Sequence, residues 1–181
     1  MTDPLLTPTL ALPLPGARLR PWRFSDATAL ARHANDRGIW LNLRDTFPHP
    51  YTAQDAEFFL CLVADNQRDL HLAIEVDGEA VGSIGVHFKA DIRRRSGEIG
   101  YWLAREQWGK GLATAAVQEL TRYVLATFDV CRLYAVVFAT NAASGRVLEK
   151  CGYELEARMR RSVVKDGQML DSLLFARIEE K

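Results

Sequence analysis

The stretch GEIGYWLAREQWGKGLATAAVQELTRYVLATF, residues 97–128, decides the fold of this chain. It begins like a strand, ends like a helix, and has Gly109 and Gly111 at the join. Glycines at such a join let the backbone approach a ligand, and the helix start beyond them presents unpaired N–H groups with a partial positive charge. The stretch therefore predicts a loop that binds an anionic group such as phosphate, with a simple tight turn as the alternative.

Two common phosphate-binding loops do not match this join. A P-loop has the pattern GxxxxGK[ST], but here the glycines are closer together and neither Lys-Ser nor Lys-Thr follows them. A Rossmann turn has the pattern GxGxxG, and Thr114 occupies the position of its third glycine. Because a GxG pair alone is a weak signal, the neighbouring segments have to distinguish a binding loop from a turn.

The segments around the join predict a mixed α/β domain with about seven strands and about four helices. Asp77-Gly78 and Asp166-Gly167 each separate two strand-like runs, which predicts two β-hairpins. Thr52 and Asp55 approximate a helix capping box. The remaining expected elements are strands at 17–24, 98–103 and 131–140, and helices at 27–35, 53–67, 112–128 and 141–152, with a short helix at 38–43.

Length and composition describe an ordinary globular domain. The chain has 181 residues, of which 48% are hydrophobic and 25% charged. Its 23 basic and 23 acidic residues cancel, which argues against a nucleic acid as the main partner. No apolar run approaches the roughly 20 residues of a membrane span, and the N-terminal segment lacks the basic start of a signal peptide. We therefore expect a cytoplasmic protein that contacts neither nucleic acid nor membrane.

The cysteines and histidines give no sign of a metal site. Three widely separated cysteines form no CxxC pair, so a disulfide framework and a zinc site are both disfavoured. Four histidines show no metal-ligand spacing and are expected to be surface or internally paired residues: His33, His49, His71 and His87. We therefore expect no metal.

The first sixteen residues differ in composition from the rest. Four of the seven prolines lie within the first fifteen residues. Proline fixes the backbone and removes a donor, so residues 1–16 are expected to form an extended arm. The folded domain is expected to span residues 17–181.

The order strand, WGKGLAT, helix, buried strand and NAASGRVLEKCGY resembles the GNAT superfamily of acetyl-CoA-dependent N-acetyltransferases. The pyrophosphate motif of that superfamily, [QR]xxGx[GA], aligns with residues 108–113. Gly111 and Ala113 match it, and Trp108 stands in place of the first Gln or Arg. The stretches FPHPYTAQDAE, GEIGYWL and DGQMLDSLLFA are similar to the branch of the RimJ and RimL ribosomal-protein N-terminal acetyltransferases. The resemblance covers the chain from about Ala17 onward and implies one GNAT domain, with a mixed sheet splayed between its fourth and fifth strands.

The resemblance implies where acetyl-CoA would bind. Backbone N–H groups of the loop would hold the pyrophosphate, and Lys110 would either meet a phosphate or remain solvated. Trp102 and Leu103, beyond a splay after Tyr101, would hold the pantetheine arm and polarise the thioester carbonyl through their backbone groups. The residues assigned to this co-substrate are Trp102, Leu103, Trp108, Gly109, Lys110, Gly111, Leu112, Ala113, Thr114, Asn141 and Ser144.

Two residues are the catalytic candidates. Glu98 begins the strand where many members of the superfamily have a glutamate that removes the amine proton, and a carboxylate paired with one of the arginines 93–95 is the alternative. Many relatives have a tyrosine acid seven residues after the asparagine of this motif, but Leu148 stands there. Ser144 is therefore the candidate for assisting the thiolate, and a small helix residue without a role is the alternative.

The acceptor is expected to be a primary amine. The branch that is resembled includes enzymes that acetylate the N-terminal α-amine of a protein, and the arginines at 93–95 and 158–161 offer positions that could meet an acidic peptide. A small-molecule amine is one alternative, and a non-catalytic acyl-CoA-binding module of the same fold is another. Transfer is expected to be direct, without an acyl-cysteine intermediate, and the branch also suggests a homodimer.

Overall fold

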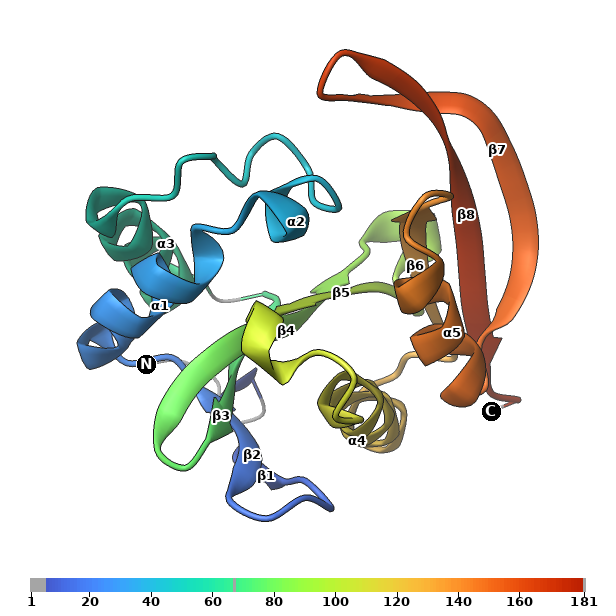
Figure 1. Ribbon diagram of the computed structural model, residues 1–181. Helices are drawn as coiled ribbons and strands as arrows, with labels where there is room; N and C mark the ends of the chain where they lie inside the picture. Colours follow the sequence, from blue (N-terminus) through green and yellow to red (C-terminus); the bar gives the residue numbers. More distant parts are fainter. Residues whose placement is uncertain (1–5, 67, 181) are drawn as a thin grey trace.

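The computed structural model describes residues 6–66 and 68–180, and within them eight strands form one mixed sheet (Figure 1). The strand order across the sheet is β1-β2-β3-β4-β5-β6-β8-β7. Every neighbouring pair is antiparallel except β5 and β6, which are parallel. The strands are β1 (Leu10–Ala11), β2 (Ala17–Pro21), β3 (Leu70–Val76), β4 (Glu79–Phe88), β5 (Ser96–Leu103), β6 (Arg132–Phe138), β7 (Glu154–Lys165) and β8 (Gln168–Ile178).

Five α-helices lie around the sheet in the described part of the chain. They are α1 (Ala27–Ala34), α2 (Arg37–Trp40), α3 (Ala53–Asp65), α4 (Leu112–Thr127) and α5 (Ala142–Lys150). The predicted capping box is confirmed at the start of α3, where the Asp55 carboxylate accepts the Thr52 N–H at 2.8 Å. The expected end of that helix at Gln67 lies outside the described residues. No helix in the described ranges has both the length and the apolarity needed to cross a bilayer.

Both predicted hairpins are confirmed. Asp77 and Gly78 have φ values of +50° and +91°, and Asp166 and Gly167 have values of +50° and +72°. Two-residue hairpin turns of this kind need positive φ at both central positions, which is why Asp-Gly favours them. The first turn joins β3 to β4, and the second joins the long strands β7 and β8.

Helices cover the sheet on both faces. Leu120 and Val124 of α4 are fully buried with Ile99 of β5 in the larger core cluster. Leu30 of α1 belongs to a second cluster, against which Trp102 of β5 packs. Because successive strand residues point to opposite faces, one strand supplies side chains to both cores. Figure 1 shows β5 running between the two groups of helices.

Part of the N-terminal arm packs against the domain. Leu10 pairs with Leu19 of β2, and Leu6 and Leu12 are each 7% exposed in the larger core cluster. The arm therefore adds a short edge strand, which accounts for the eighth strand of the sheet. The division of the chain into an N-terminal arm, residues 1–16, and a domain, residues 17–181, stays a prediction.

A buried charge network fastens α1 to the sheet. Arg20 of β2 is 2% exposed and donates two hydrogen bonds to Asp26, at 2.7 and 2.8 Å. It also pairs with Glu75 of β3, which Arg18 contacts at 2.6 Å from the half-exposed side. Burial alone would raise the pKa of Glu75, but Arg20 and Arg18 outweigh burial and hold that pKa below its ordinary value.

We expect Arg20→Met to lower the free energy of unfolding by about 3–5 kcal/mol, because it leaves two carboxylates buried without their main partner. Arg18→Met is the matched control and should cost less than about 1 kcal/mol, because that pair is half exposed. Urea unfolding at neutral pH measures both. Equal losses for the two variants would contradict the network.

Candidate functional site

Strands β5 and β6 separate in the middle of the sheet. Their parallel ladder has three pairs and ends where Glu98 meets Tyr134. Strand β5 then continues along β4 to Leu103. The splay is predicted between the fourth and fifth strands, which are β5 and β6 because the additional strand β1 comes first. It is confirmed between these two strands, but it starts after Glu98 and not after Tyr101. Beyond it, the β5 edge that faces β6 has no strand partner, so a gap opens there.

Alternation along β5 decides which backbone groups face this gap. The Ala104 N–H donates to the Val81 carbonyl of β4 at 2.7 Å, so Trp102, two residues earlier, also directs its backbone groups to β4. In agreement, a Cβ atom on Gly82 of β4 would lie 2.5 Å from the Trp102 carbonyl oxygen. Leu103 lies between these residues and faces the gap. The Trp102 backbone groups are therefore directed to β4 and those of Leu103 to the gap, and the expected ligand contacts of both residues stay predictions.

The glycine loop has the conformation that its glycines allow. Gly109 and Gly111 have φ values of +76° and +80°, and a Cβ atom on either would meet no heavy atom of the described chain within 4 Å. The first helical bond of α4 runs from the Ala115 N–H to the Gly111 carbonyl. The N–H groups of residues 112–114 therefore have no acceptor within the helix. An open space lined by unpaired donors and a helix N-terminus suits a phosphate group.

Trp108 braces the loop. Its indole N–H donates to the Leu103 carbonyl at the end of β5, at 2.9 Å. The Arg105 guanidinium lies over its ring, 5.3 Å from the centroid, and a Cβ atom on Gly38 of α2 would lie 3.6 Å from the ring edge. Tryptophan at the first motif position thus ties the loop to the strand that borders the gap. Leu103 keeps its N–H as the group directed to the gap, because its carbonyl is already bonded.

Lys110 leaves its two interpretations open. Its ammonium donates to the Gln107 side chain at 3.3 Å, and the residue is exposed. A phosphate in the loop would compete with that amide for the charge, because an ionised pair is stronger than a bond to a neutral acceptor.

Helix α5 contributes a hydroxyl that pairs with one on β5. The Asn141 side-chain oxygen accepts the Ser144 N–H at 3.1 Å and caps the helix. The Ser144 hydroxyl lies 2.8 Å from the Tyr101 hydroxyl, and burial raises the pKa of Tyr101 to about 12. Leu148 is fully buried. Sequence reasoning missed Tyr101 as a site residue, although it shares a strand face with Ile99 and Leu103, which was readable from the alternation of EIGYWL.

Glu98 lies on the opposite face of β5, at the point where the ladder ends. Its carboxylate contacts the Lys89 ammonium at 2.8 Å, the Arg44 guanidinium and, at 3.4 Å, the Tyr134 hydroxyl. The alternative interpretation, a pairing with one of the arginines 93–95, is corrected in its partners, because Lys89 and Arg44 hold the carboxylate. Burial alone would raise the pKa of Glu98, but Lys89 and Arg44 outweigh burial and hold that pKa below its ordinary value.

The last hairpin and the loop after α2 meet near Glu98. The Lys165 ammonium of β7, which is 2% exposed, contacts Asp45 at 2.7 Å and lies 3.8 Å from the ring centroid of Trp40. Arg37 of α2 contacts Asp166 at the hairpin turn at 2.5 Å. In Figure 1 the tip of the β7–β8 hairpin arches toward α2. These contacts connect the segment that carries Arg44 to the hairpin. The connected segments lie over the face of β5 that carries Glu98.

The cysteines are not arranged as acyl carriers. Burial raises the pKa of Cys151 to about 11, and its thiol donates to the Thr114 carbonyl at 3.5 Å. A protonated, buried thiol is a poor nucleophile. Cys131 is half-buried against the Arg95 carbonyl, and Cys61 lies exposed on α3.

Comparisons with known proteins identify the family of this chain. The sequence matches the acetyltransferase (GNAT) domain family over residues 17–154. It is 32% identical to the uncharacterised N-acetyltransferase YoaA of Bacillus subtilis over 57% of this chain and 58% of YoaA. It is also 32% identical to the [ribosomal protein uS5]-alanine N-acetyltransferase of Escherichia coli, over 43% of this chain and 40% of that enzyme.

A solved structure covers more of the chain. Mycobacterium smegmatis RimJ in complex with CoA-disulfide has a TM-score of 0.83 and 28% identity, over 95% of this chain and 86% of RimJ. By contrast, the chain matches less than two thirds of the length of the two curated relatives. The fold thus has a solved counterpart in complex with CoA-disulfide, whereas the site residues and the acceptor have to be argued from the geometry.

Proposed function

Since the chain belongs to the GNAT family of acetyl-CoA-dependent N-acetyltransferases, we propose that it transfers the acetyl group directly to the N-terminal α-amine of a protein or peptide. The observation that carries this choice of acceptor is the pairing of Glu98 with Lys89 and Arg44. A carboxylate with a lowered pKa is a weak base, so the acceptor has to supply much of its own neutral amine.

The glycine loop would hold the pyrophosphate of coenzyme A. Its open space and the three free N–H groups at the start of α4 fit an anion, and Thr114 adds a hydroxyl in the same turn. Asn141 uses its side-chain oxygen as a helix cap, which leaves its amide N–H₂ to bond a pantetheine carbonyl. The Leu103 N–H, directed to the gap, would polarise the thioester carbonyl.

Tyr101 and Ser144 would stabilise the departing thiolate. A phenol with a pKa of about 12 stays protonated at neutral pH, and a thiol has an ordinary pKa near 8.5. Full proton transfer from Tyr101 to the thiolate is therefore uphill by more than three pKa units. We assign the pair a hydrogen-bonding role, in which Ser144 orients the phenol and solvent supplies the proton.

Glu98 would receive the acceptor as a cation. Arg44 is 69% exposed, so an incoming ammonium group can displace it from the carboxylate at little cost in buried charge. The ammonium then gives its proton to Glu98 or, through it, to water, and the neutral amine attacks the thioester carbonyl while the thiolate leaves. An α-amine with a pKa of about 8 is roughly one-tenth neutral at pH 7, whereas a lysine amine near 10.4 is neutral in about one molecule in a few thousand. The site therefore favours the α-amine.

The arginines do not distinguish a peptide acceptor from a small-molecule amine. The arginines expected to meet an acidic peptide are partly engaged, because Arg95 contacts Asp129 and Arg158 contacts Asp171. They therefore add little to the argument for a peptide. The family match favours an enzyme over a non-catalytic binding module, and the expected homodimer stays a prediction.

We expect Gly111→Glu to abolish measurable binding of acetyl-CoA, because its carboxylate would enter the phosphate space and repel the pyrophosphate. Gly111→Ala is the matched control: it has the same strain at positive φ without the charge, so it should weaken binding far less. Calorimetry compares the two. Similar affinities for wild type and Gly111→Glu would mean that the loop is only a turn.

We expect Glu98→Gln to lower kcat at pH 7 by about 10²-fold, with little change in acetyl-CoA affinity. Raising the pH should restore part of the rate, because the amine then loses its proton without help. Lys89→Gln breaks one of the same ion pairs but keeps the carboxylate, so it should stay within several-fold of wild type. If Lys89→Gln lost as much kcat as Glu98→Gln, the role of Glu98 would be structural.

The acceptor test compares kcat/KM for three amine classes, measured as thiol release. We expect short peptides with free N-termini to react, the same peptides with blocked termini to fail, and polyamine or aminoglycoside amines to react more slowly. Small amines that outpace every free peptide would overturn the protein acceptor and leave the acetyl-CoA half of the function intact.

A further inference from the structure

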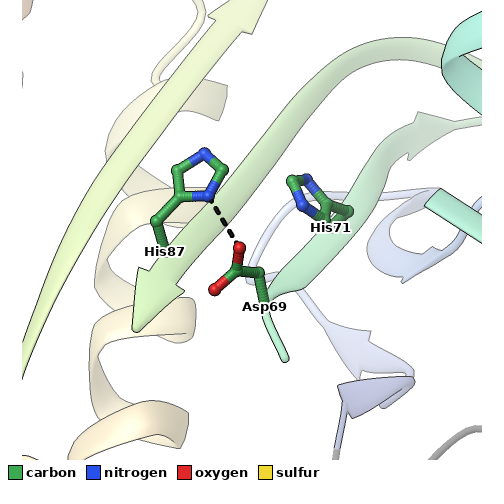
Figure 2. Close-up of side chains that lie close together, drawn as sticks. All are labelled: Asp69, His71 and His87. Carbon is green, nitrogen blue, oxygen red and sulfur yellow. Dashed lines mark hydrogen bonds and ion pairs between the residues drawn. The ribbon is translucent and has the colours of Figure 1, made fainter. Parts of the chain in front are cut away.

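A cluster of three metal-ligating side chains lies outside the acetyl-CoA site. Asp69 directly precedes β3, His71 is its second residue, and His87 lies near the end of β4 (Figure 2). Their ligand atoms all lie within 4.8 Å of one another. No metal-ligand spacing is readable in the sequence, because His71 and His87 are sixteen positions apart and come together only through the β3–β4 hairpin.

The antiparallel register explains the juxtaposition. Leu70 pairs with Val86 and His71 with Gly85, so extending the ladder by one step sets Asp69 opposite His87. Residues directly opposite or diagonal on one face of an antiparallel pair have side chains within reach of each other. Two of the three side chains are thereby held by strands, which position ligands better than loops do.

The donor set is that of a transition-metal site. Two imidazoles and one carboxylate suit Zn²⁺ and related divalent ions, and three protein ligands leave one coordination position open. Bonds of about 2.0 Å in tetrahedral geometry place neighbouring ligand atoms roughly 3.3 Å apart. The Nδ1 atom of His87 and the Oδ2 atom of Asp69 are already 3.0 Å apart, and a His71 ring nitrogen lies within 4.8 Å of both, so closure requires mainly that His71 approach this pair.

The surrounding bonds orient the carboxylate. The Oδ1 atom of Asp69 accepts the Phe88 N–H at 2.9 Å, which turns Oδ2 toward the histidines. The backbone carbonyl of Asp69 accepts the Asn66 side-chain N–H at 2.5 Å. The His71 ring packs edge-on against Phe59, with centroids 6.5 Å apart. The two hydrogen bonds to Asp69 are outer-shell bonds of the kind that fix ligand orientation in metal sites.

A cavity of about 210 Å³ adjoins the cluster and has Asp69, His71 and Trp22 in its wall. The Trp22 indole nitrogen is buried without a hydrogen-bond partner among the described residues. A buried N–H without an acceptor costs free energy. The cavity beside the cluster thus has room for a small ligand and, in its wall, the N–H donor of Trp22.

We propose that Asp69, His71 and His87 bind one divalent transition-metal ion, with Zn²⁺ as the best match, and that the ion clamps the open ends of β3 and β4. His87 is the cross-strand neighbour of Glu98, so the clamp fixes the strand end beside that carboxylate. The proposed acetyl transfer uses no metal, so the ion acts on the structure at this end of β3 and β4 and not on the chemistry.

The test uses the full chain without an affinity tag, stripped of metal by a chelator. Zn²⁺ is titrated in competition with a chromogenic chelator, and Mg²⁺ serves as the hard-ion control. We expect one Zn²⁺ per chain, no comparable Mg²⁺ binding, and at least about tenfold weaker Zn²⁺ binding in His71→Ala, His87→Ala and Asp69→Asn. His49→Ala and Cys61→Ser, which remove ligand types elsewhere, should bind Zn²⁺ as wild type does.

A second measurement keeps the proposal testable if a variant folds poorly. His87 is 50% exposed, so His87→Ala should keep the metal-free melting temperature and the acetyl-CoA affinity of wild type. Zn²⁺ should raise the melting temperature of wild type and leave that of His87→Ala unchanged. Equal Zn²⁺ affinity or an equal thermal shift in wild type and His87→Ala would overturn the site, whether or not acetyl transfer is observed.

Discussion

The early end of the β5–β6 ladder is the constraint on which the rest of the molecule depends. Three parallel pairs hold these strands together, and beyond Glu98 the edge of β5 has no neighbouring strand. Buried backbone groups need partners, so a gap in the middle of a sheet has to be filled by ligand, water or side chains. Trp108 takes the Leu103 carbonyl, and the remaining gap-facing groups are left to a ligand.

One strand serves two chemistries because its residues alternate. On the face toward α4 and α5, Tyr101 reaches the Ser144 hydroxyl, where the thiolate would leave. On the face toward α1 and α3, Glu98 and Trp102 border the side where an amine would enter. The two reactants would thus approach β5 from opposite sides. Positioning of this kind can supply much of a bimolecular rate enhancement without unusual side chains.

The charges around Glu98 restrict the kind of amine that the site can accept. Lys89 and Arg44 stabilise the carboxylate, which makes Glu98 an anchor for a cation and a weak base. An acceptor that is already partly neutral at pH 7 fits such a site. The ion pairs of Lys165 and Arg37 join the segment that carries Arg44 to the β7–β8 hairpin. We therefore expect binding of an acceptor to be coupled to movement of Arg44.

Local signals in the sequence predicted most of the elements and the loop, but not the short strand β1. Asp-Gly pairs predicted both hairpins, the glycines at 109 and 111 predicted a loop at the join of strand and helix, and Asn141 predicted the start of α5, because each depends on a few adjacent residues. Partners distant in the chain were not readable. The cations on Glu98, the hydroxyl pair at Tyr101 and the cluster of Asp69, His71 and His87 arise from strand register and from packing between segments. Only the tertiary structure decides such contacts, because register sets which side chains share a face.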